Sequence, residues 1–491
     1  MTDLTNKIPL EVSQVTKTLN KGGFEAYIVG GCVRDLIIGR EPKDWDVTTN
    51  ANPEEIQALF VKTFYENDYG TVGVVNEDVI HETLKVVEVT PFRIEGKYTD
   101  HRHPDSVKFA NKLEDDLKRR DFTMNAIAYD IDKGHLIDPY KGQEDIKDKV
   151  IRTVGEAGDR FTEDALRMIR AIRFSTELGF MINKETSDAI EKHAELLTKI
   201  SIERIRDEFC KIIMSPNPMA GIVMLQRYGI LKYIVPELEE GLGIKQNGDH
   251  IYEVWEHNLR ALNHSADRGW PLDVRIGALL HDVGKPRTRL WNKEKNDYTF
   301  YGHDVVGGKM TSKILTRLKF PNDFIDNVSK LVRYHMFFSD IETITLSAVR
   351  RIVKNVGPEN VWNLMKVRAC DRIGMGRPKE QPYRLRKYEA MIEEAMRAPV
   401  SVGMLKIDGL KIIEITKTPP GPKIGYILHA LLEEVLDDPT LNTAEYLENK
   451  ALALINLDEK GLKELGDKGK ESKEEAEDKE VGEIRKRHGV K

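Results

Sequence analysis

The sequence predicts an α+β head followed by mostly α-helical domains. Short runs rich in Val and Ile, separated by turns, fill the first 150 residues and are typical of strands. From about Arg152 onward, apolar residues recur three and four positions apart, which is typical of helices. At 491 residues the chain is too long for one core, so several domains are expected.

The elements of the head follow from local patterns. Residues 53–64 are expected to form a helix, because Pro53 suits a first helical turn. The predicted strands occupy 26–31, 71–76, 84–92 and 125–131.

Breaks in the helical pattern suggest the later boundaries. We expect a head over 1–150, a neck over 151–240, a His-rich domain over 241–375 and a tail over 376–457. Residues 458–491 carry no aromatic side chain and have mixed charges. This composition predicts a solvated, disordered extension.

Composition limits the functional classes. The three cysteines, Cys32, Cys210 and Cys370, are far apart, which argues against a disulfide framework or zinc knuckle and suits a reducing compartment. The chain has no signal pattern and no apolar run of about eighteen residues, so we expect a cytoplasmic protein without a membrane partner. With a net charge of −6, any nucleic-acid surface must be a local basic patch. The sequence does not distinguish a monomer from a dimer.

The stretch "YIVGGCVRDLIIGREPKDWDVTT" begins at Tyr27 and contains a glycine pair. Glycines at a strand end let the backbone turn sharply and approach a ligand. The amides of the following helix would then face this space, which suits a triphosphate. We expect Gly31 to supply a backbone contact and Arg34 a charge-assisted hydrogen bond.

The same stretch ends in "DWDVTT", where strand alternation places Asp44 and Asp46 on one face. Neighbouring carboxylates repel unless they share divalent cations, and oxygen ligands favour Mg²⁺ over zinc. Glu88 is the candidate third carboxylate, on a neighbouring strand. Such a site would activate a hydroxyl on one metal and stabilise departing pyrophosphate with the other. Taken singly, a glycine turn or an Asp-x-Asp pair is also common in ordinary surface strands.

Together, at this spacing, these motifs resemble the signature of the polymerase-β-like nucleotidyltransferase superfamily. The stretches at 117–130, 136–146 and 160–174 narrow the likeness to class II tRNA nucleotidyltransferases, the CCA-adding enzymes and bacterial poly(A) polymerases. The likeness runs from about Tyr27 to Phe209 and continues more weakly to about Leu454. It implies template-independent addition of CCA to the tRNA 3′ end from CTP and ATP, with Mg²⁺ in the head.

The motif "EDALR" is open to two interpretations. Asp164 and Arg167 are three residues apart and would share a helix face, which Arg170 and Arg173 extend, as in a surface ion-pair ladder. Alternatively, a carboxylate that accepts and a guanidinium that donates would match cytosine and adenine and mismatch uracil and guanine. The resemblance implies the second role for Asp164 and Arg167, and implies that Arg120, Arg170 and Arg173 hold the nucleotide.

Two further stretches bear on specificity. The polar segment at 93–117 corresponds to a flexible family loop associated with switching from C to A addition, and its full length argues against an enzyme adding two cytidines alone. A poly(A) polymerase or an A-adding enzyme stays as the alternative. The segment between Phe64 and Glu88 lacks a basic "GRR" insertion, which favours CCA addition. Arg119, Asp121 and Asn125 are expected to support the nucleotide site.

A second candidate centre lies in the His-rich domain. Its motifs, which include "LLHDVGKP", resemble the HD phosphohydrolase superfamily. The resemblance implies a divalent transition metal or Mg²⁺ bound by His257, His281, Asp282 and Asp371. His303 and His335 would supply a second metal or hold a phosphate. A helical scaffold without metal is the alternative to an active phosphodiesterase or phosphatase.

The segment at 405–436 resembles the family's tail, which grips tRNA; plain helical packing explains it almost as well. Hypotheses of another class are an HD phosphohydrolase on an RNA-binding scaffold and a non-catalytic RNA-binding protein. Intact Asp44, Asp46, Arg120, Asp164 and Arg167 argue against the first of these hypotheses, and two complete sets of candidate metal ligands argue against the second.

Overall fold

The computed structural model describes residues 3–65, 70–77, 79–95, 107–247, 250–336, 344–397 and 402–490. The chain forms two compact units. One comprises Met1–His335 with Lys366–Pro378, and the other comprises Met336–Met365 with Lys379–Lys491. The first unit carries every candidate site residue.

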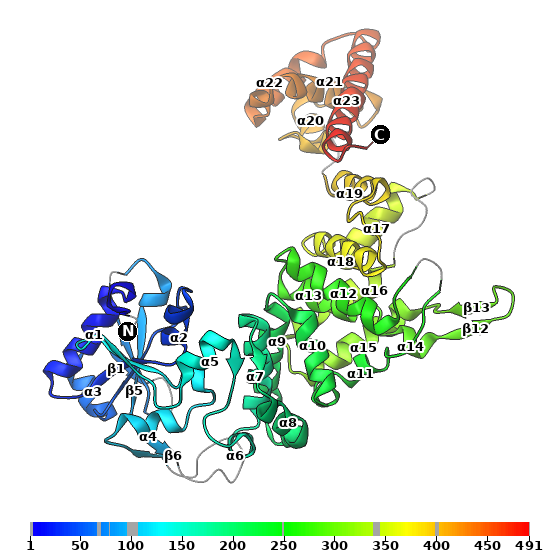
Figure 1. The fold of residues 1–491 in the computed structure, drawn as a ribbon. Coiled ribbons are helices and arrows are strands. Elements are labelled where there is room, and N and C mark those ends of the chain that lie inside the picture. The colour runs from blue at the N-terminus through cyan, green and yellow to red at the C-terminus, as the bar shows by residue number, and fades with distance from the viewer. Residues whose placement is uncertain are drawn as a thin grey trace. The chain divides into compact units, whose positions relative to one another are not determined.

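The first unit begins with a seven-stranded mixed sheet in the order β3-β4-β5-β2-β1-β8-β9. Its strands β1 and β5 are labelled in the blue part of the ribbon (Figure 1). Strands β2 and β5 run parallel, whereas the other neighbouring pairs run antiparallel. The strands are β1 (Ala26–Val29), β2 (Asp46–Thr49), β3 (Thr63–Tyr65), β4 (Val72–Val75), β5 (Val86–Pro91), β8 (Ala128–Asp130) and β9 (His135–Ile137). A separate pair comprises β6 (Arg93–Glu95) and β7 (Val107–Phe109), and the helices are α1 (Leu10–Lys21), α2 (Gly31–Ile38), α3 (Pro53–Leu59), α4 (Leu113–Lys118) and α5 (Gly142–Asp148).

The structure confirms the predicted strands of the head. The helix expected over 53–64 begins at Pro53, where Asn52 and Glu55 form a capping box, but it ends at Leu59. Residues Thr63–Tyr65 pair with β4 instead, so sheet pairing overrides the helical pattern there. Residues 96–106 of the predicted specificity loop lie outside the described residues.

Helices make up most of the rest of the first unit. Those of the neck are α6 (Ala157–Glu163), α7 (Leu166–Leu178), α8 (Lys184–His193), α9 (Ile202–Met214), α10 (Pro218–Arg227) and α11 (Pro236–Glu239), with β10 (Val150–Ile151) paired to β11 (Met181–Ile182). The His-rich region contains α12 (Val254–Asp267), α13 (Leu272–Leu280), α14 (Lys285–Thr288), the hairpin β12 (Leu290–Asn292) and β13 (Asp297–Thr299), α15 (His303–Arg317), α16 (Asn322–Tyr334) and α18 (Val361–Gly374). The α+β head followed by helical regions is therefore confirmed.

The second unit corrects one prediction. It contains α17 (Leu346–Val356), α19 (Tyr383–Met396), α20 (Gly409–Thr416), α21 (Pro422–Asp437), α22 (Ala444–Leu454) and α23 (Glu459–Arg487). The segment 458–491 was expected to be disordered, but α23 packs against α21 and α19.

The physical reason is that a few correctly spaced apolar side chains are enough to pack α23 against its neighbouring helices. Leu462 and Ile484 of α23 are buried. At Gly466 and Gly469 the helix approaches the backbone of Tyr426 and His429 so closely that a Cβ would lie 2.8 and 2.2 Å from it. Its many charged residues form ion pairs along the surface, such as the one between Lys468 and Glu433.

Within the described residues, helices long and apolar enough to cross a membrane are absent.

Candidate active site and metal centre

The glycine turn at Gly30 follows the end of β1, and Asp44 and Asp46 lie at the start of the neighbouring antiparallel strand β2. Gly30 has φ of +86°, a conformation that favours glycine. A Cβ on Gly30 would lie 2.9 Å from Nη1 of Arg120 and 3.5 Å from Oδ2 of Asp46. The strictest glycine requirement therefore falls on Gly30, whereas the sequence-based prediction named Gly31, the first residue of α2.

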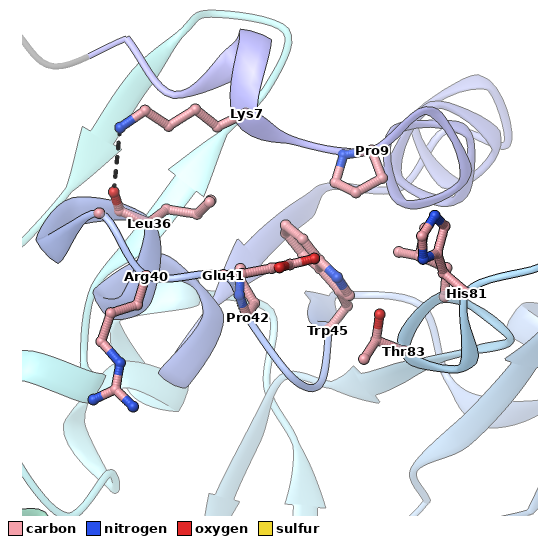
Figure 2. Close-up of a pocket in the computed structure, with 11 residues that line it drawn as sticks. Lys7, Pro9, Leu36, Arg40, Glu41, Pro42, Trp45, His81 and Thr83 are labelled. Carbon is pink, nitrogen blue, oxygen red and sulfur yellow. Dashed lines mark hydrogen bonds between the residues drawn. The ribbon is translucent and has the colours of Figure 1, made fainter. Parts of the chain in front are cut away.

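The carboxylates lie as strand alternation predicts, although β2 begins at Asp46 and Asp44 precedes it. A cleft of about 590 Å³ is lined by Asp44 and Asp46 together with Gly31, Arg34 and Arg173. Trp45, between the aspartates, lines a different cavity of about 440 Å³ with Pro9 and His81 (Figure 2). The aspartates and the tryptophan of this short segment therefore line two different cavities.

Glu88 is the register partner of Asp46 on the parallel strands β2 and β5. Residues paired in this way point to the same face of the sheet. Burial raises the pKa of Asp46, and so does the nearby Asp44 carboxylate, while Arg120 opposes both effects. A group of oxygen donors that destabilise one another's charge fits a divalent cation.

Arg120 is held beside these carboxylates by a buried ion pair that sequence analysis missed. Its Nη2 lies 3.0 Å from Oδ2 of Asp116, which is fully buried and also binds Arg119 at 2.6 Å. Burial opposes ionisation of Asp116, but the two arginines lower its pKa. The i to i+4 spacing of Asp116 and Arg120 in a polar helical segment could have predicted this ion pair.

A hydrogen-bonded chain links α2 to α7. Arg34 Nη1 donates to Oδ1 of Asn125 at 2.8 Å, and Asn125 Nδ2 donates to Oδ1 of Asp121 at 3.0 Å. Arg170 Nη2 then donates to Oδ2 of Asp121 at 2.6 Å. Burial would raise the pKa of Asp121, but Arg170 and Asn125 outweigh it and hold that pKa well below its usual value.

Three of the predicted nucleotide-binding arginines contact the ring of Phe174. The guanidinium carbons of Arg173, Arg34 and Arg170 lie 4.1, 5.1 and 5.4 Å from its ring centroid. Phe174 also lines the cleft with Asp44 and Asp46. Stacking on one ring fixes the guanidinium planes near the cleft, with cation–π attraction as the stabilising term.

The structure modifies the geometry expected for "EDALR". Asp164 lies in the break between α6 and α7 with extended backbone, and its Oδ1 accepts the Leu166 amide at 3.0 Å. The expected single helix face therefore begins at Arg167, because Asp164 is the C-cap of α6 and precedes α7 instead of joining it.

Each member of this pair has its own partner. Arg204 of α9 binds Asp164 at 2.8 Å, and Glu163 binds Arg167 at 2.6 Å. Arg167 also donates to the carbonyl oxygen of Arg119 at 3.0 Å, next to Arg120. Asp164 and Arg167 are thus held by separate partners, and Arg204 had no local signal because it lies 40 residues away in sequence.

The His-rich cluster comes from five helical segments of the first unit. All its predicted members are buried, and Asp282 is shared between two candidate metal-binding sets. One set is Asp282 with His303 and His335. The other is His257, Asp282 and Asp371 with His250, which sequence analysis had not singled out.

The atoms of the cluster converge in the manner of metal ligands. Nε2 of His257 lies 2.8 Å from Nε2 of His281 and 3.0 Å from Oδ2 of Asp282. Nε2 of His303 lies 3.3 Å from Oδ1 of Asp282. The carbonyl oxygens of Ala278, Phe300 and Val332 accept from Nδ1 of His281, His303 and His335, which turns each Nε2 inward.

The electrostatics of the cluster agree with this donor set. Among the described residues, neither carboxylate oxygen of Asp282 has a hydrogen-bond partner of good geometry, although Nζ of Lys285 lies 2.6 Å away. Burial on its own would lower the pKa of His281, but Asp282 and Asp371 raise it to about 10. Burial and the cationic Lys285 lower the pKa of His250 to about 4. Clustered imidazole and carboxylate donors suit a divalent transition metal.

Close packing holds the "HD" residues in place. A Cβ on Gly284 would lie 2.3 Å from the carbonyl oxygen of His303 and 2.6 Å from the amide nitrogen of Gly307. A side chain at this position would therefore separate α14 from α15. The glycine of "HDVGK" keeps Asp282 and His303 within reach of each other.

Comparisons with known proteins agree with this architecture. Residues 26–152 match the model of the poly A polymerase head domain, residues 179–242 the probable RNA and SrmB- binding site of polymerase A, and residues 248–391 the HD domain. The CCA-adding enzyme of Geobacillus stearothermophilus is 33% identical over 444 residues, which cover 89% of this chain and 94% of the relative. The chain belongs to the CCA-adding enzyme family.

Further relatives support this assignment. The CCA-adding enzyme of Lactobacillus johnsonii is 49% identical over 426 residues, covering 86% of this chain and 92% of the relative. The crystal structure of the Bacillus stearothermophilus CCA-adding enzyme in complex with CTP has a TM-score of 0.56 and 31% identity, covering 91% of this chain and 98% of that one. The Thermotoga maritima CCA-adding enzyme with tRNA, at 18% identity and a TM-score of 0.51, shares the fold. The predicted enzyme class, a tRNA nucleotidyltransferase, is confirmed.

Proposed function

We propose that this enzyme adds CCA to the 3′ end of tRNA from CTP and ATP without a nucleic-acid template. The observation that carries the proposal is the cleft shared by Asp44 and Asp46 of the head and Arg173 and Phe174 of α7. It joins candidate metal ligands to a face that carries the candidate nucleotide-binding arginines. Relatives that cover most of the chain are CCA-adding enzymes, and one was solved with CTP.

In this proposal Asp44, Asp46 and Glu88 hold Mg²⁺ in the head. Bound Mg²⁺ would lower the pKa of the attacking hydroxyl and neutralise charge on the departing pyrophosphate. The amides at the start of α2 and the guanidinium groups of Arg34 and Arg120 bind the triphosphate. The ion pair of Arg120 with buried Asp116 fixes where that positive charge lies.

Base selection is assigned to Asp164 and Arg167. The carboxylate accepts from the exocyclic amine of cytosine or adenine, and the guanidinium donates to the adjacent ring nitrogen. Uracil and guanine would place acceptor against acceptor and donor against donor, which a desolvated site penalises. Arg204 and Glu163 hold the two side chains apart, so that each can face the same base edge.

The domain assignment completes the proposal. The head is residues 1–150, the neck 151–240, the HD domain 241–375 and the tRNA-binding tail 376–457. The tail would bind tRNA through the Pro-Gly turn before α21. The helix α23 extends the tail.

A second activity is favoured by the HD cluster. We assign to it a metal-dependent phosphodiesterase or phosphatase activity, because two donor sets, buried apart from the half-buried His250, share Asp282. His257, His281, Asp282 and Asp371 would hold one divalent ion, with His250 beside them. His303 and His335 would hold a second ion or a substrate phosphate.

The decisive experiment uses tRNA transcripts that lack the terminal three, two or one nucleotides. Each is incubated with one labelled nucleotide at a time. We expect CMP on the first two and AMP on the last, with termination after the A. Continued A addition would indicate a poly(A) polymerase, and activity on the CC end alone would indicate an A-adding enzyme.

A further inference from the structure

The hairpin formed by β12 and β13 carries exposed aromatic and cationic side chains that neither proposed reaction uses. It extends away from the helices that hold the HD cluster (Figure 1). Leu290, Trp291 and Tyr301 are 69, 51 and 71% exposed. A two-stranded hairpin is marginally stable by itself, so large apolar side chains exposed on one suggest a surface that another molecule covers.

One face of the hairpin carries two aromatic rings and a cation in contact with one another. Trp291 and Tyr298 are register partners whose ring centroids lie 5.0 Å apart in a T-shaped arrangement. The guanidinium carbon of Arg289 lies 3.6 Å from the Tyr298 centroid. In the part of the chain that the structure describes, Nε of Arg289 is buried and has no hydrogen-bond partner. This face therefore combines an exposed indole with a guanidinium group held against the neighbouring Tyr298 ring.

The charge of this segment differs in sign from that of the whole chain. Between residues 285 and 301 the basic residues are Lys285, Arg287, Arg289, Lys293 and Lys295, and the acidic residues are Glu294 and Asp297. Lys285 is buried and pairs with Asp282, and Arg287 pairs with Glu240. Arg289, Lys293 and Lys295 against Glu294 and Asp297 then leave a local charge of +1, whereas the chain carries −6. These three cations are the groups at the hairpin that can neutralise the phosphates of a polyanion.

Both ends of the hairpin are tied to the HD cluster. Lys285, before β12, contacts Asp282, and His303, after β13, belongs to the cluster itself. Nδ2 of Asn247 donates to the carbonyl oxygen of Tyr298 at 2.6 Å, which ties β13 to the segment leading to His250. The base of the hairpin is therefore connected to this centre.

We propose that the Arg289–Trp291–Tyr298 face binds an unpaired RNA strand. An indole stacks on any unpaired base, and the neighbouring cations neutralise phosphates. A base inside a duplex is already stacked and does not offer its face, so single-stranded RNA is the occupant that fits this face. The proposal does not require the HD cluster to be catalytic.

The test is binding of a fluorescently labelled U6 RNA to the full-length protein in EDTA, which removes metal-dependent chemistry at both centres. Trp291→Ala should weaken binding about tenfold, and Trp291→Phe should retain most of it. Leu290→Ala is the matched control, because Leu290 is 69% exposed, against 51% for Trp291, and lies on the opposite face of the same hairpin. Arg289→Gln should weaken binding and reduce the slope of log K against log salt by about 0.7.

Equal affinities of wild type, Trp291→Ala and Arg289→Gln would overturn the proposal. A duplex RNA that binds as tightly as U6 and depends on Trp291 to the same extent would also overturn it. Binding of a labelled acidic peptide in place of RNA, with the same dependence on Trp291, would identify a protein-docking surface instead. Unfolding midpoints and CMP addition to tRNA report whether each variant is folded, and Arg289→Gln keeps the test decisive if Trp291→Ala is unstable.

Discussion

Arg204 binds the carboxylate of Asp164 with Nη2 at 2.8 Å and Nη1 at 3.4 Å, bringing α9 to the start of α7. This pairing orients the Asp164 side chain near Arg167. The backbone amide of Arg167 donates to the carbonyl oxygen of Asp164 at 3.0 Å, while the two side chains have separate partners. A carboxylate and a guanidinium held separately are suited to read one base edge together.

The proposed protein template yields the first prediction. Replacing both Asp164 and Arg167 with Ala should lower discrimination against UTP and GTP, while addition continues at reduced rate. Mispairing a buried donor or acceptor costs about 1–3 kcal/mol, so the preference should fall by roughly 5- to 150-fold. The measurement is kcat/KM for all four nucleotides on matched tRNA ends.

The matched control is the double variant Lys184→Ala/Asp188→Ala, which removes an exposed ion pair on α8. Equal loss of rate for all four nucleotides, with the wild-type preference kept, would show that Asp164 and Arg167 are structural.

The second prediction concerns the head carboxylates. Asp44→Ala or Asp46→Ala should abolish incorporation of both CMP and AMP, because each removes an oxygen donor from the proposed metal site. Binding of tRNA, measured by filter retention, should change little, since the metals serve the chemistry. Glu41→Gln is the control, because Glu41 lines the same cleft. Incorporation retained by both aspartate variants would reject the assignment.

The third prediction concerns the HD cluster. His281→Ala or Asp282→Ala should remove hydrolysis of bis(p-nitrophenyl) phosphate or p-nitrophenyl phosphate, assayed with Ni²⁺, Co²⁺, Mn²⁺ and Mg²⁺. Addition of CMP and AMP should persist, because the head has its own ligands. A wild-type protein inactive with all four metals would identify the region as a scaffold.

The fourth prediction follows from the lowered pKa of Asp121. A carboxylate whose pKa is lower in the folded state stabilises the fold above its unfolded value of about 3.9, and this contribution is lost as the pH falls further. Asp121→Asn should therefore cost about 2 kcal/mol at pH 7. Its deficit relative to wild type should shrink below about pH 4. Urea unfolding at several pH values measures this difference, and a constant deficit would contradict it.

The fifth prediction tests the packed C-terminal helix. Leu462 is fully buried, so Leu462→Ala should destabilise the second unit by about 2–5 kcal/mol. Leu457→Ala, at a position 41% exposed, should have little effect. Hydrogen exchange of α21 and α23 locates the change; identical exchange in both variants would argue for the disordered extension that composition predicts.

Features that depend on neighbouring residues followed from the sequence alone. The alternation of Asp44, Trp45 and Asp46 separates carboxylates from an apolar ring, because strand periodicity is local. The glycine turn, the helical neck and the "HD" pair were likewise predicted from short patterns, since turn and helix propensities act over a few residues. Glu88 was named from its strand, and the parallel register of β2 and β5 brings it beside Asp46.

Tertiary structure decided which distant groups meet. Arg204 reaches Asp164, and Asp282 joins two ligand sets, because packing of separate helices sets these distances and no local spacing encodes them. The break in helix at Asp164 and the strand at Thr63–Tyr65 arose where capping and sheet pairing outweighed periodicity. The order of α23 has the same origin: Leu462 and Ile484 stabilise it only because α21 and α19 provide surfaces that bury them.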